Sequence, residues 1–226
     1  MTAIDTTTDT VSTDTVSTGT RNDVVLDQFV DDTLATARVA FDVLHQTDAL
    51  LPSGTVQINE RVPGRDLLVG INYPSPWTSR SPELRASVFG FDGTSVSGDP
   101  RAARGARRFA AIFEQHPDVS TVVHVHSPYL GALAQVHRVL PVRGTPLHAV
   151  LGVDELPVYL DRRQSEVDYI LEQLDRTPGL EAIVEANGGA TVWGRRGLAE
   201  TARTILTIEQ AARAYVLSAP VADAAS

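Results

Sequence analysis

The chain has 226 residues, of which 42% are hydrophobic and 21% are charged, and its formal net charge is −9. This length and apolar content fit one globular domain, and the acidic balance argues against a nucleic-acid groove, which needs basic surface to neutralise phosphates. The chain has no cysteine, and all 19 basic residues are arginine. Thiolate chemistry, disulfides, Schiff bases and lysine-linked pyridoxal phosphate are therefore excluded.

The sequence shows neither a membrane-spanning segment nor a secretory signal, and this bears on where the protein acts and what it binds. No apolar run approaches the roughly 20 residues that a membrane helix needs, and the N-terminal residues lack the basic and apolar regions of a secretory signal. We therefore expect a cytoplasmic protein that binds neither membrane nor nucleic acid and acts on a small molecule.

Three regions are expected along the chain: an N-terminal tail over 1–20, one domain over 21–219 and a C-terminal tail over 220–226. The first 20 residues are mostly Thr, Ser and Asp, with almost nothing apolar to bury, so they are predicted to be disordered. From 24 to 51, apolar residues recur at helical spacing and predict one long helix or two short ones.

Hydrophobic periodicity and breaker residues predict the elements that follow. Expected strands are 56–62, 67–73, 87–91, 119–126, 140–142, 156–159 and two strands within 182–193 separated by a Gly-Gly break; expected helices are 99–115, 128–136, 166–174 and 197–217. The order predicts a sheet flanked by helices from both ends of the chain.

The segment Thr121-Val122-Val123-His124-Val125-His126 is the most informative motif. Side chains alternate along a strand, so His124 and His126 point to the same face and can reach one metal ion. Two histidines make only half of a metal site, so the missing ligands decide the chemistry.

With these elements in order, the chain resembles the class II aldolase and adducin-like superfamily over roughly Leu34 to Leu217. The most specific match is His-Pro-Asp-Val-Ser-Thr-Val-Val-His-Val-His-Ser-Pro-Tyr at 116–129, which is similar to the family's metal-binding signature. Further matches are Pro52-Ser53-Gly54-Thr55, Phe91-Asp92-Gly93 with Ser97-Gly98-Asp99, and Asn187-Gly188-Gly189 with Val192-Trp193-Gly194. The resemblance implies an α/β/α layered fold with a mostly antiparallel central sheet, and a homo-oligomer, expected as a tetramer with active sites between subunits.

Several family positions carry unexpected residues. The third metal histidine corresponds to Gly188, the catalytic acid to Gly105, and two phosphate-binding serines to Ala103 and Arg104, while the asparagine of the early loop becomes Thr55. The resemblance therefore predicts a diverged member and not a standard sugar-phosphate aldolase.

The resemblance assigns His124 and His126 as metal ligands and catalytic residues, with zinc, iron or manganese as the candidate ion; a hydrogen-bonded pair without metal is the alternative. His148 lies where related epimerases carry a histidine, so it is the expected third ligand or general base. Carboxylates that can instead complete a facial triad with the two histidines are Asp154, Glu155 and Glu185.

Substrate contacts are expected from three residues. Arg104 stands where the family holds phosphate and can grip an anionic group with two hydrogen bonds. Thr55 lies in the early loop, and Tyr129 is a candidate phenolic acid or a packing residue. The other arginines of this helix, Arg101, Arg107 and Arg108, are expected at the surface.

Three functions remain open at this point. The first is a lyase-type enzyme of small-molecule metabolism, with specialised biosynthesis as one setting, that cleaves a C–C bond, decarboxylates or rearranges a carbonyl or carboxylate substrate. The second is a metal-free acid/base enzyme, or a non-haem iron oxygenase, on the same fold. The third is a non-catalytic scaffold or binding subunit of the adducin kind.

Overall fold

The computed structural model describes residues 19–52, 54–73, 83–143, 145–160, 163–186 and 188–224. The N-terminal tail expected over 1–20 lies outside the described residues except for Gly19 and Thr20, which begin the first helix. Ser53 and Asn187, two residues of the motif matches, also lie outside them.

An eight-stranded sheet forms the centre of the molecule, with strand order β4-β3-β2-β1-β5-β10-β9-β8. All neighbouring strands are antiparallel except β8 and β9. Its strands are β1 (Val56–Arg61), β2 (Leu67–Asn72), β3 (Ala86–Gly90), β4 (Ser95–Gly98), β5 (Thr121–His126), β8 (Val158–Tyr159), β9 (Ala182–Glu185) and β10 (Gly189–Gly194). A separate pair joins β6 (Leu140–Pro141) to β7 (Glu155–Leu156).

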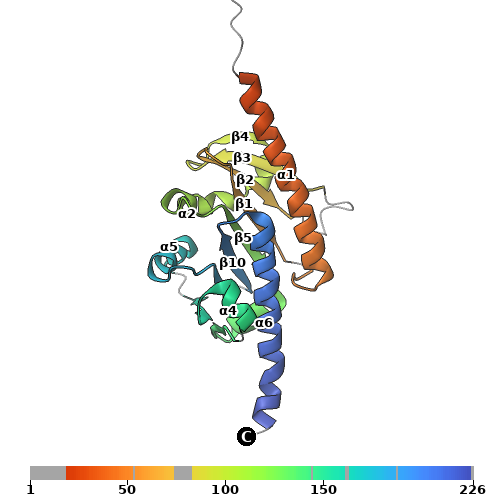
Figure 1. The fold of residues 1–226 in the computed structure, drawn as a ribbon, viewed down its shortest axis with the longest axis vertical. Helices are drawn as coiled ribbons and strands as arrows, with labels where there is room; N and C mark the ends of the chain where they lie inside the picture. The colour runs from red at the N-terminus through yellow and green to blue at the C-terminus, as the bar shows by residue number, and fades with distance from the viewer. Residues whose placement is uncertain are drawn as a thin grey trace, which may run out of the picture.

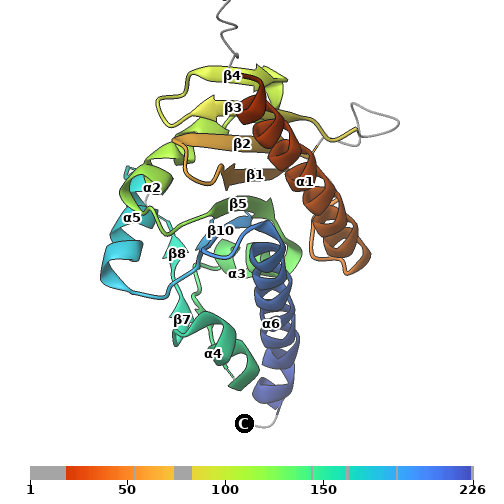
Figure 2. The same cartoon turned by 45° about the horizontal axis from the view of Figure 1, so that its top comes forward.

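Helices cover both faces of this sheet, which confirms the expected α/β fold with a mostly antiparallel sheet. The long helices α1 (Gly19–Gln46) and α6 (Leu198–Ala224) lie along one face (Figure 1). The short helices α2 (Ala110–Gln115) and α5 (Glu166–Arg176) lie on the opposite side (Figure 2). The remaining helices are the 3-10 turns η1 (Pro100–Ala103) and η2 (Ala106–Phe109), with α3 (Pro128–Gln135) and α4 (Thr145–Leu151).

The helix expected over 99–115 is broken in the structure. It consists of η1, η2 and α2, and the break falls at Arg104 and Gly105. Gly105 has φ of 83°, in the left-handed region that a residue with a Cβ rarely adopts. This break turns the backbone of Arg104 toward the sheet, where its carbonyl accepts a hydrogen bond from Gln57.

Other boundaries differ from the sequence expectation in short elements. The single strand expected over 156–159 is two strands, β7 and β8, in different sheets on either side of Pro157, which has no N–H to donate. Strand β4 and helix α4 were not predicted, because neither shows a clear periodicity over so few residues. Helix α6 continues to Ala224, into the region expected as a C-terminal tail.

The C-terminal end of β5 and the start of α3 are held by contacts to three other parts of the chain. Ser127 donates its hydroxyl hydrogen to the carbonyl of Ala49. The carboxylate of Glu209 in α6 accepts the backbone N–H groups of Tyr129 and Leu130, two otherwise unpaired donors in the first turn of α3. Helix α3 also approaches the β9–β10 turn so closely that a Cβ at Gly131 would lie 2.8 Å from the carbonyl oxygen of Gly188. These contacts fix the position of the histidine pair.

Among the described residues, no helix combines the length and the apolar character that crossing a membrane requires.

Candidate active site

His124 lies near the centre of the sheet, between two polar side chains on neighbouring strands. The register pairs it with Gln57 on β1 and with Thr191 on β10. Since directly paired residues point to the same face, the three side chains form a polar row. His126 follows on the same face, with its ring centroid 5.2 Å from that of His124. The prediction that the two histidines share one face is confirmed.

A buried carboxylate contacts His124. Oε1 of Glu185, which is 1% exposed, lies 3.1 Å from Nδ1 of His124. The hydroxyl of Thr191 lies 3.0 Å from the same nitrogen and 2.5 Å from the same carboxylate oxygen. Because a carboxylate can only accept, this contact favours the His124 tautomer that carries its proton on Nδ1. Nε2 is then an acceptor.

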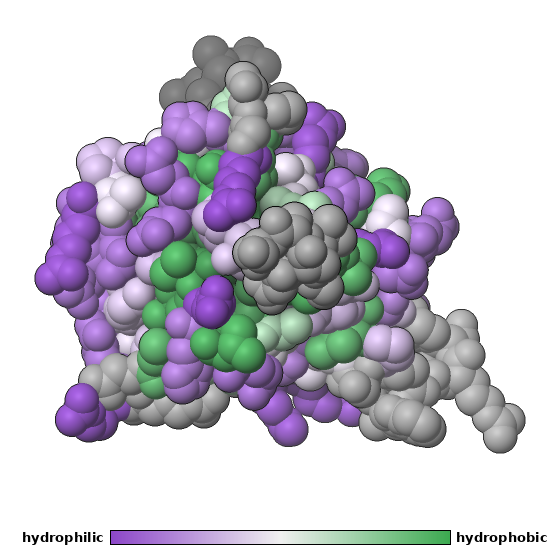
Figure 3. Space-filling model, turned by 90° about the horizontal axis from the view of Figure 1, so that it is seen from below, coloured by the Kyte–Doolittle hydropathy of each residue, from purple (hydrophilic) through white to green (hydrophobic). Residues whose placement is uncertain are grey.

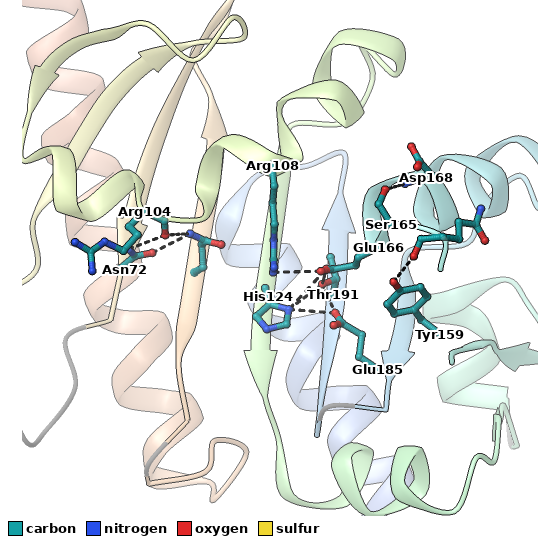
Figure 4. Close-up of polar contacts among 12 residues, drawn as sticks. Asn72, Arg104, Arg108, His124, Tyr159, Ser165, Glu166, Asp168, Glu185 and Thr191 are labelled. Atoms are coloured by element: carbon teal, nitrogen blue, oxygen red, sulfur yellow. Dashed lines mark hydrogen bonds and ion pairs between the residues drawn. The ribbon is translucent and has the colours of Figure 1, made fainter. Parts of the chain in front are cut away.

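Glu166 extends this cluster from a different layer of the molecule, as Figure 4 shows. It is the first residue of α5, whose N-cap Ser165 accepts the N–H of Asp168. Glu166 Oε1 lies 2.8 Å from the Thr191 hydroxyl and 3.9 Å from Nδ1 of His124. Its other oxygen lies 3.3 Å from a guanidinium nitrogen of Arg108.

The two carboxyl groups have pKa values displaced in opposite directions. Burial, together with the nearby charge of Glu185, raises the pKa of Glu166. Burial also acts to raise the pKa of Glu185, but its hydrogen bonds with His124 and Thr191 and the His124 charge outweigh it, and the net pKa is lowered. Glu185 is therefore the more acidic of the two carboxyl groups.

His126 is half-buried at the end of β5. Burial first, and then the neighbouring His124, lower the pKa of His126 below its usual value. The shift favours the neutral imidazole, which can accept a proton or bind a metal ion.

The side chains of His124 and His126 line a cavity of about 730 Å³ between β1, β2, β5 and the 3-10 turns. Three arginines line it and no carboxylate does, among the described residues; its lining is Thr55, Val56, Gln57, Asn72, Tyr73, Arg101, Arg104, Gly105, Arg108, His124 and His126. Two of these arginines are paired with carboxylates just outside the lining, Arg101 with Asp99 and Arg108 with Glu166.

Gln57 and Asn72 form the floor beside Gly105, and sequence analysis identified neither. The Gln57 amide donates to the Arg104 carbonyl at 2.7 Å and to the Asn72 side-chain oxygen at 3.1 Å. A Cβ at Gly105 would lie 3.2 Å from this amide nitrogen. The space in front of Gly105 is therefore filled by the Gln57 amide.

The donor set at this site fits a divalent metal ion. Ligand atoms of His124, Glu166 and Glu185 lie within 4.8 Å of one another, and Oε2 of Glu185 is buried without a hydrogen-bond partner among the described residues. One imidazole and two carboxylates suit iron, manganese or zinc. His124 would then lose the Nδ1 proton that it donates to Glu185.

The structure places the other predicted residues as follows. Arg104 and Thr55 line the cavity with the histidines. His148 lies on α4 with its side chain 55% exposed and 3.5 Å from the exposed Asp154, and it does not line the cavity. Tyr129 is half-buried at the start of α3, 5.6 Å from the guanidinium of Arg213. Of the three candidate carboxylates, only Glu185 contacts a histidine of the pair.

Two charged residues that the sequence analysis did not assign to the site belong to it. Arg108 was expected at the surface, and its side chain is 43% exposed, but it also lines the cavity and pairs with Glu166. Glu166 appeared only as the first residue of an amphipathic helix. No local pattern marks either residue, because their proximity depends on how η2 and α5 pack over the same face of the sheet.

Comparison with known proteins agrees with this fold. Residues 62–216 match the family described as Class II Aldolase and Adducin N-terminal domain. The chain therefore belongs to the class II aldolase and adducin family. None of the curated proteins matches the chain.

Solved structures of several aldolases share the fold. An L-fuculose 1-phosphate aldolase superposes with a TM-score of 0.63 at 15% identity, over 84% of this chain and 85% of that one. YgbL from Escherichia coli, described as a putative aldolase/epimerase/decarboxylase, gives 0.62 at 22% identity, over 86% and 91%. A sugar-phosphate aldolase from Thermotoga maritima gives 0.58 at 13% identity, over 87% and 97%.

Proposed function

We propose that this protein is an enzyme that transfers protons on an anionic small molecule bearing a carbonyl group, with C–C cleavage, decarboxylation or a related rearrangement as the outcome. The observation that carries the proposal is the buried His124–Glu185 pair at the wall of an arginine-lined cavity. A hydrogen-bonded carboxylate and histidine beside a pocket is the arrangement of a general base with its orienting group.

His124 is the base in this account. Glu185 accepts its Nδ1 proton, so the other nitrogen can take a proton from a substrate in the cavity. Glu185 also stabilises the imidazolium that forms, since its carboxylate is 3.1 Å away. His126, neutral and on the same wall, is a second proton acceptor or a hydrogen-bonding group for the substrate.

Substrate binding is assigned to the cationic and polar residues of the cavity. The side chain of Arg104 is exposed and makes no ion pair with a described residue, so its guanidinium is available for a carboxylate or phosphate. Thr55 contributes a hydroxyl from the loop that lies against His126. Gly105 offers no acid where the resemblance expects one, and this favours a reaction other than standard sugar-phosphate aldol cleavage.

A divalent metal ion held by His124, Glu166 and Glu185 would polarise the substrate carbonyl or stabilise an enolate. His126, on the same cavity wall, would then be the remaining histidine able to accept a proton. A non-haem iron oxygenase is the second candidate, because one histidine and two carboxylates are ligands that iron accepts.

We also propose that the chain forms a homo-oligomer, expected as a tetramer. Hydrophobic residues gather in patches on the face shown in Figure 3, and exposed aliphatic side chains in and around α3, α4 and β8 are Val136, Val139, Val150 and Leu160. Apolar patches of this kind are common at subunit contacts. Analytical ultracentrifugation tests the assembly, and a monomer at micromolar concentration would contradict it.

The enzymatic proposal is tested by incubating the purified protein with a panel of oxo acids, hydroxy acids and sugar phosphates, and by following each compound by proton NMR. Turnover of an anionic carbonyl compound, lost in His124→Asn, is the expected result. An intact panel, with no compound bound in saturation-transfer experiments, would support the scaffold alternative instead.

A further inference from the structure

The ion pair between Arg108 and Glu166 lies at the edge of the candidate active site. Arg108 comes from η2 and Glu166 from α5, and their closest charged atoms are 3.3 Å apart. The Arg108 side chain is 43% exposed and that of Glu166 is 11% exposed. The pair therefore joins the cavity to the buried cluster around His124 (Figure 4).

The Arg108 end of this pair is open to a ligand. Arg108 makes a single contact with Glu166, and its side chain is 43% exposed, so a dissolved anion can reach its guanidinium. The Arg108 guanidinium carbon also lies 4.5 Å from the ring centroid of Phe109, and this cation–π contact supports the side chain. An incoming anion in the cavity would meet a guanidinium that is close, partly hydrated and already oriented.

Glu166 keeps other partners when Arg108 leaves. Thr191 is 2.8 Å from its Oε1, and the residue lies in the first turn of α5, where the helix dipole favours negative charge. An exchange of Arg108 from Glu166 to a ligand therefore leaves no buried carboxyl group without a hydrogen bond.

We propose that Arg108 is a specificity-determining residue that leaves Glu166 to bind a carboxylate of the substrate. The inference rests on the proposed function and specifies its substrate class: an acid with two anionic groups, one held by Arg104 and one by Arg108. Since both arginines line one cavity with His124, the second anionic group lies on the side of the cavity nearest the base. Glu166 competes with that anionic group for the guanidinium of Arg108.

The probe is malonate, a compact dicarboxylate, with acetate as the monocarboxylate control, titrated by calorimetry into the full-length protein as purified. We expect malonate to bind more tightly than acetate. Arg108→Gln should weaken malonate binding by roughly tenfold or more, because a charge-assisted hydrogen bond is lost. Glu166→Gln should tighten it several-fold, because the competing carboxylate is removed.

The double variant Arg108→Gln/Glu166→Gln separates exchange from a general charge effect. We expect it to bind malonate as weakly as Arg108→Gln alone, because the proposed competition of Glu166 with malonate needs the Arg108 guanidinium. Asp99→Asn, which removes the partner of Arg101 on the same cavity, is the matched control and should change affinity less than Glu166→Gln.

Three outcomes would overturn the inference: no malonate binding by the wild-type protein at millimolar concentration, unchanged affinity in Arg108→Gln, or a gain from Glu166→Gln that persists in the double variant. Binding does not require turnover, so a protein that binds malonate as expected but transforms no substrate would contradict the proposed function alone.

Discussion

The carboxylate of Glu185 lies 3.1 Å from Nδ1 of His124, across 61 residues of sequence. Glu185 ends β9 and His124 lies on β5, with β10 between the two strands. Thr191 of β10 lies between them, and its hydroxyl is 3.0 Å from Nδ1 of His124 and 2.5 Å from the Glu185 carboxylate. The sheet order therefore places a buried acid behind the histidine pair.

Replacing Glu185 should impair the site without removing the histidine. We expect Glu185→Gln to lower turnover by about 10–100-fold, because an amide neither stabilises the imidazolium nor fixes its tautomer as a carboxylate does. Steady-state kinetics on the substrate found by NMR would measure the change. Glu114→Gln on the exposed side of α2 is the matched control, and an equal loss in both variants would contradict the role of Glu185.

Replacing His148 should have a small effect. Its imidazole is half exposed, pairs with an exposed aspartate and lies outside the cavity of its own chain, so His148→Ala should retain most of the wild-type activity. A loss as large as that in His124→Ala would show instead that His148 acts in a site shared between subunits, as the sequence comparison expects.

The metal content of the protein should depend on the buried group of His124, Glu166 and Glu185. If the ion is held as the donor set indicates, elemental analysis of untagged protein should show a divalent metal that is lost in Glu166→Gln/Glu185→Gln. His126→Ala should retain more of it, because His126 is outside the group of three. A metal lost only with His126 would place the ion on the histidine pair.

A side chain at Gly105 should destabilise the protein and restore no activity. The φ of 83° costs a non-glycine residue about 1 kcal/mol or more, so Gly105→Ala should lower the free energy of unfolding by that amount. Gly105→Glu should lower it further, since a Cβ already lies 3.2 Å from the Gln57 amide. Chemical denaturation measures both variants, and an active Gly105→Glu with wild-type stability would contradict the description of the cavity floor.

Glu60 should make stability depend on pH. It is buried on the face opposite the cavity, where Thr121 and the backbone N–H of Leu198 bond to it, and burial raises its pKa to about 7. With a folded-state pKa above the unfolded value, the group favours the folded state most below pH 4.5, and this contribution is lost as pH rises to 7.

The size of that effect follows from the shift, which corresponds to about 3 kcal/mol. Relative to Glu60→Gln, the wild-type protein should lose about that much unfolding free energy between pH 4.5 and 7.5. Urea denaturation of both proteins across this range provides the measurement. If the difference in unfolding free energy between the two proteins stayed constant with pH, Glu60 would have the same pKa in the folded and unfolded states.

Patterns of local sequence predicted most of the fold. Alternation located β1, β2, β5 and β10 within a residue or two, and the side-chain period of two put His124 and His126 on one face. The break at Gly105 was not predicted, because the segment reads as a continuous helix until the Gln57–Arg104 contact of the tertiary structure is known.

The candidate site was predictable only where its residues come from one strand. Glu185 was one of three candidate carboxylates, and its place two residues before the Gly-Gly hairpin was the only sequence signal in its favour; the strand order then brings it to His124, unlike Asp154 and Glu155. Arg108 and Glu166 are 58 residues apart and meet through helix packing, which no spacing rule encodes. His148 was favoured by the resemblance, whereas the fold of the single chain places it on α4 away from the cavity.

We propose that His124, oriented by Glu185, removes a proton from an anionic carbonyl substrate. Deuterium exchange at the carbon next to that carbonyl, followed by NMR in heavy water for the wild-type protein and for His124→Asn, reports this step itself. We expect exchange catalysed by the wild-type protein, reduced at least about a hundredfold in the variant. Exchange at the same rate in both proteins would contradict it.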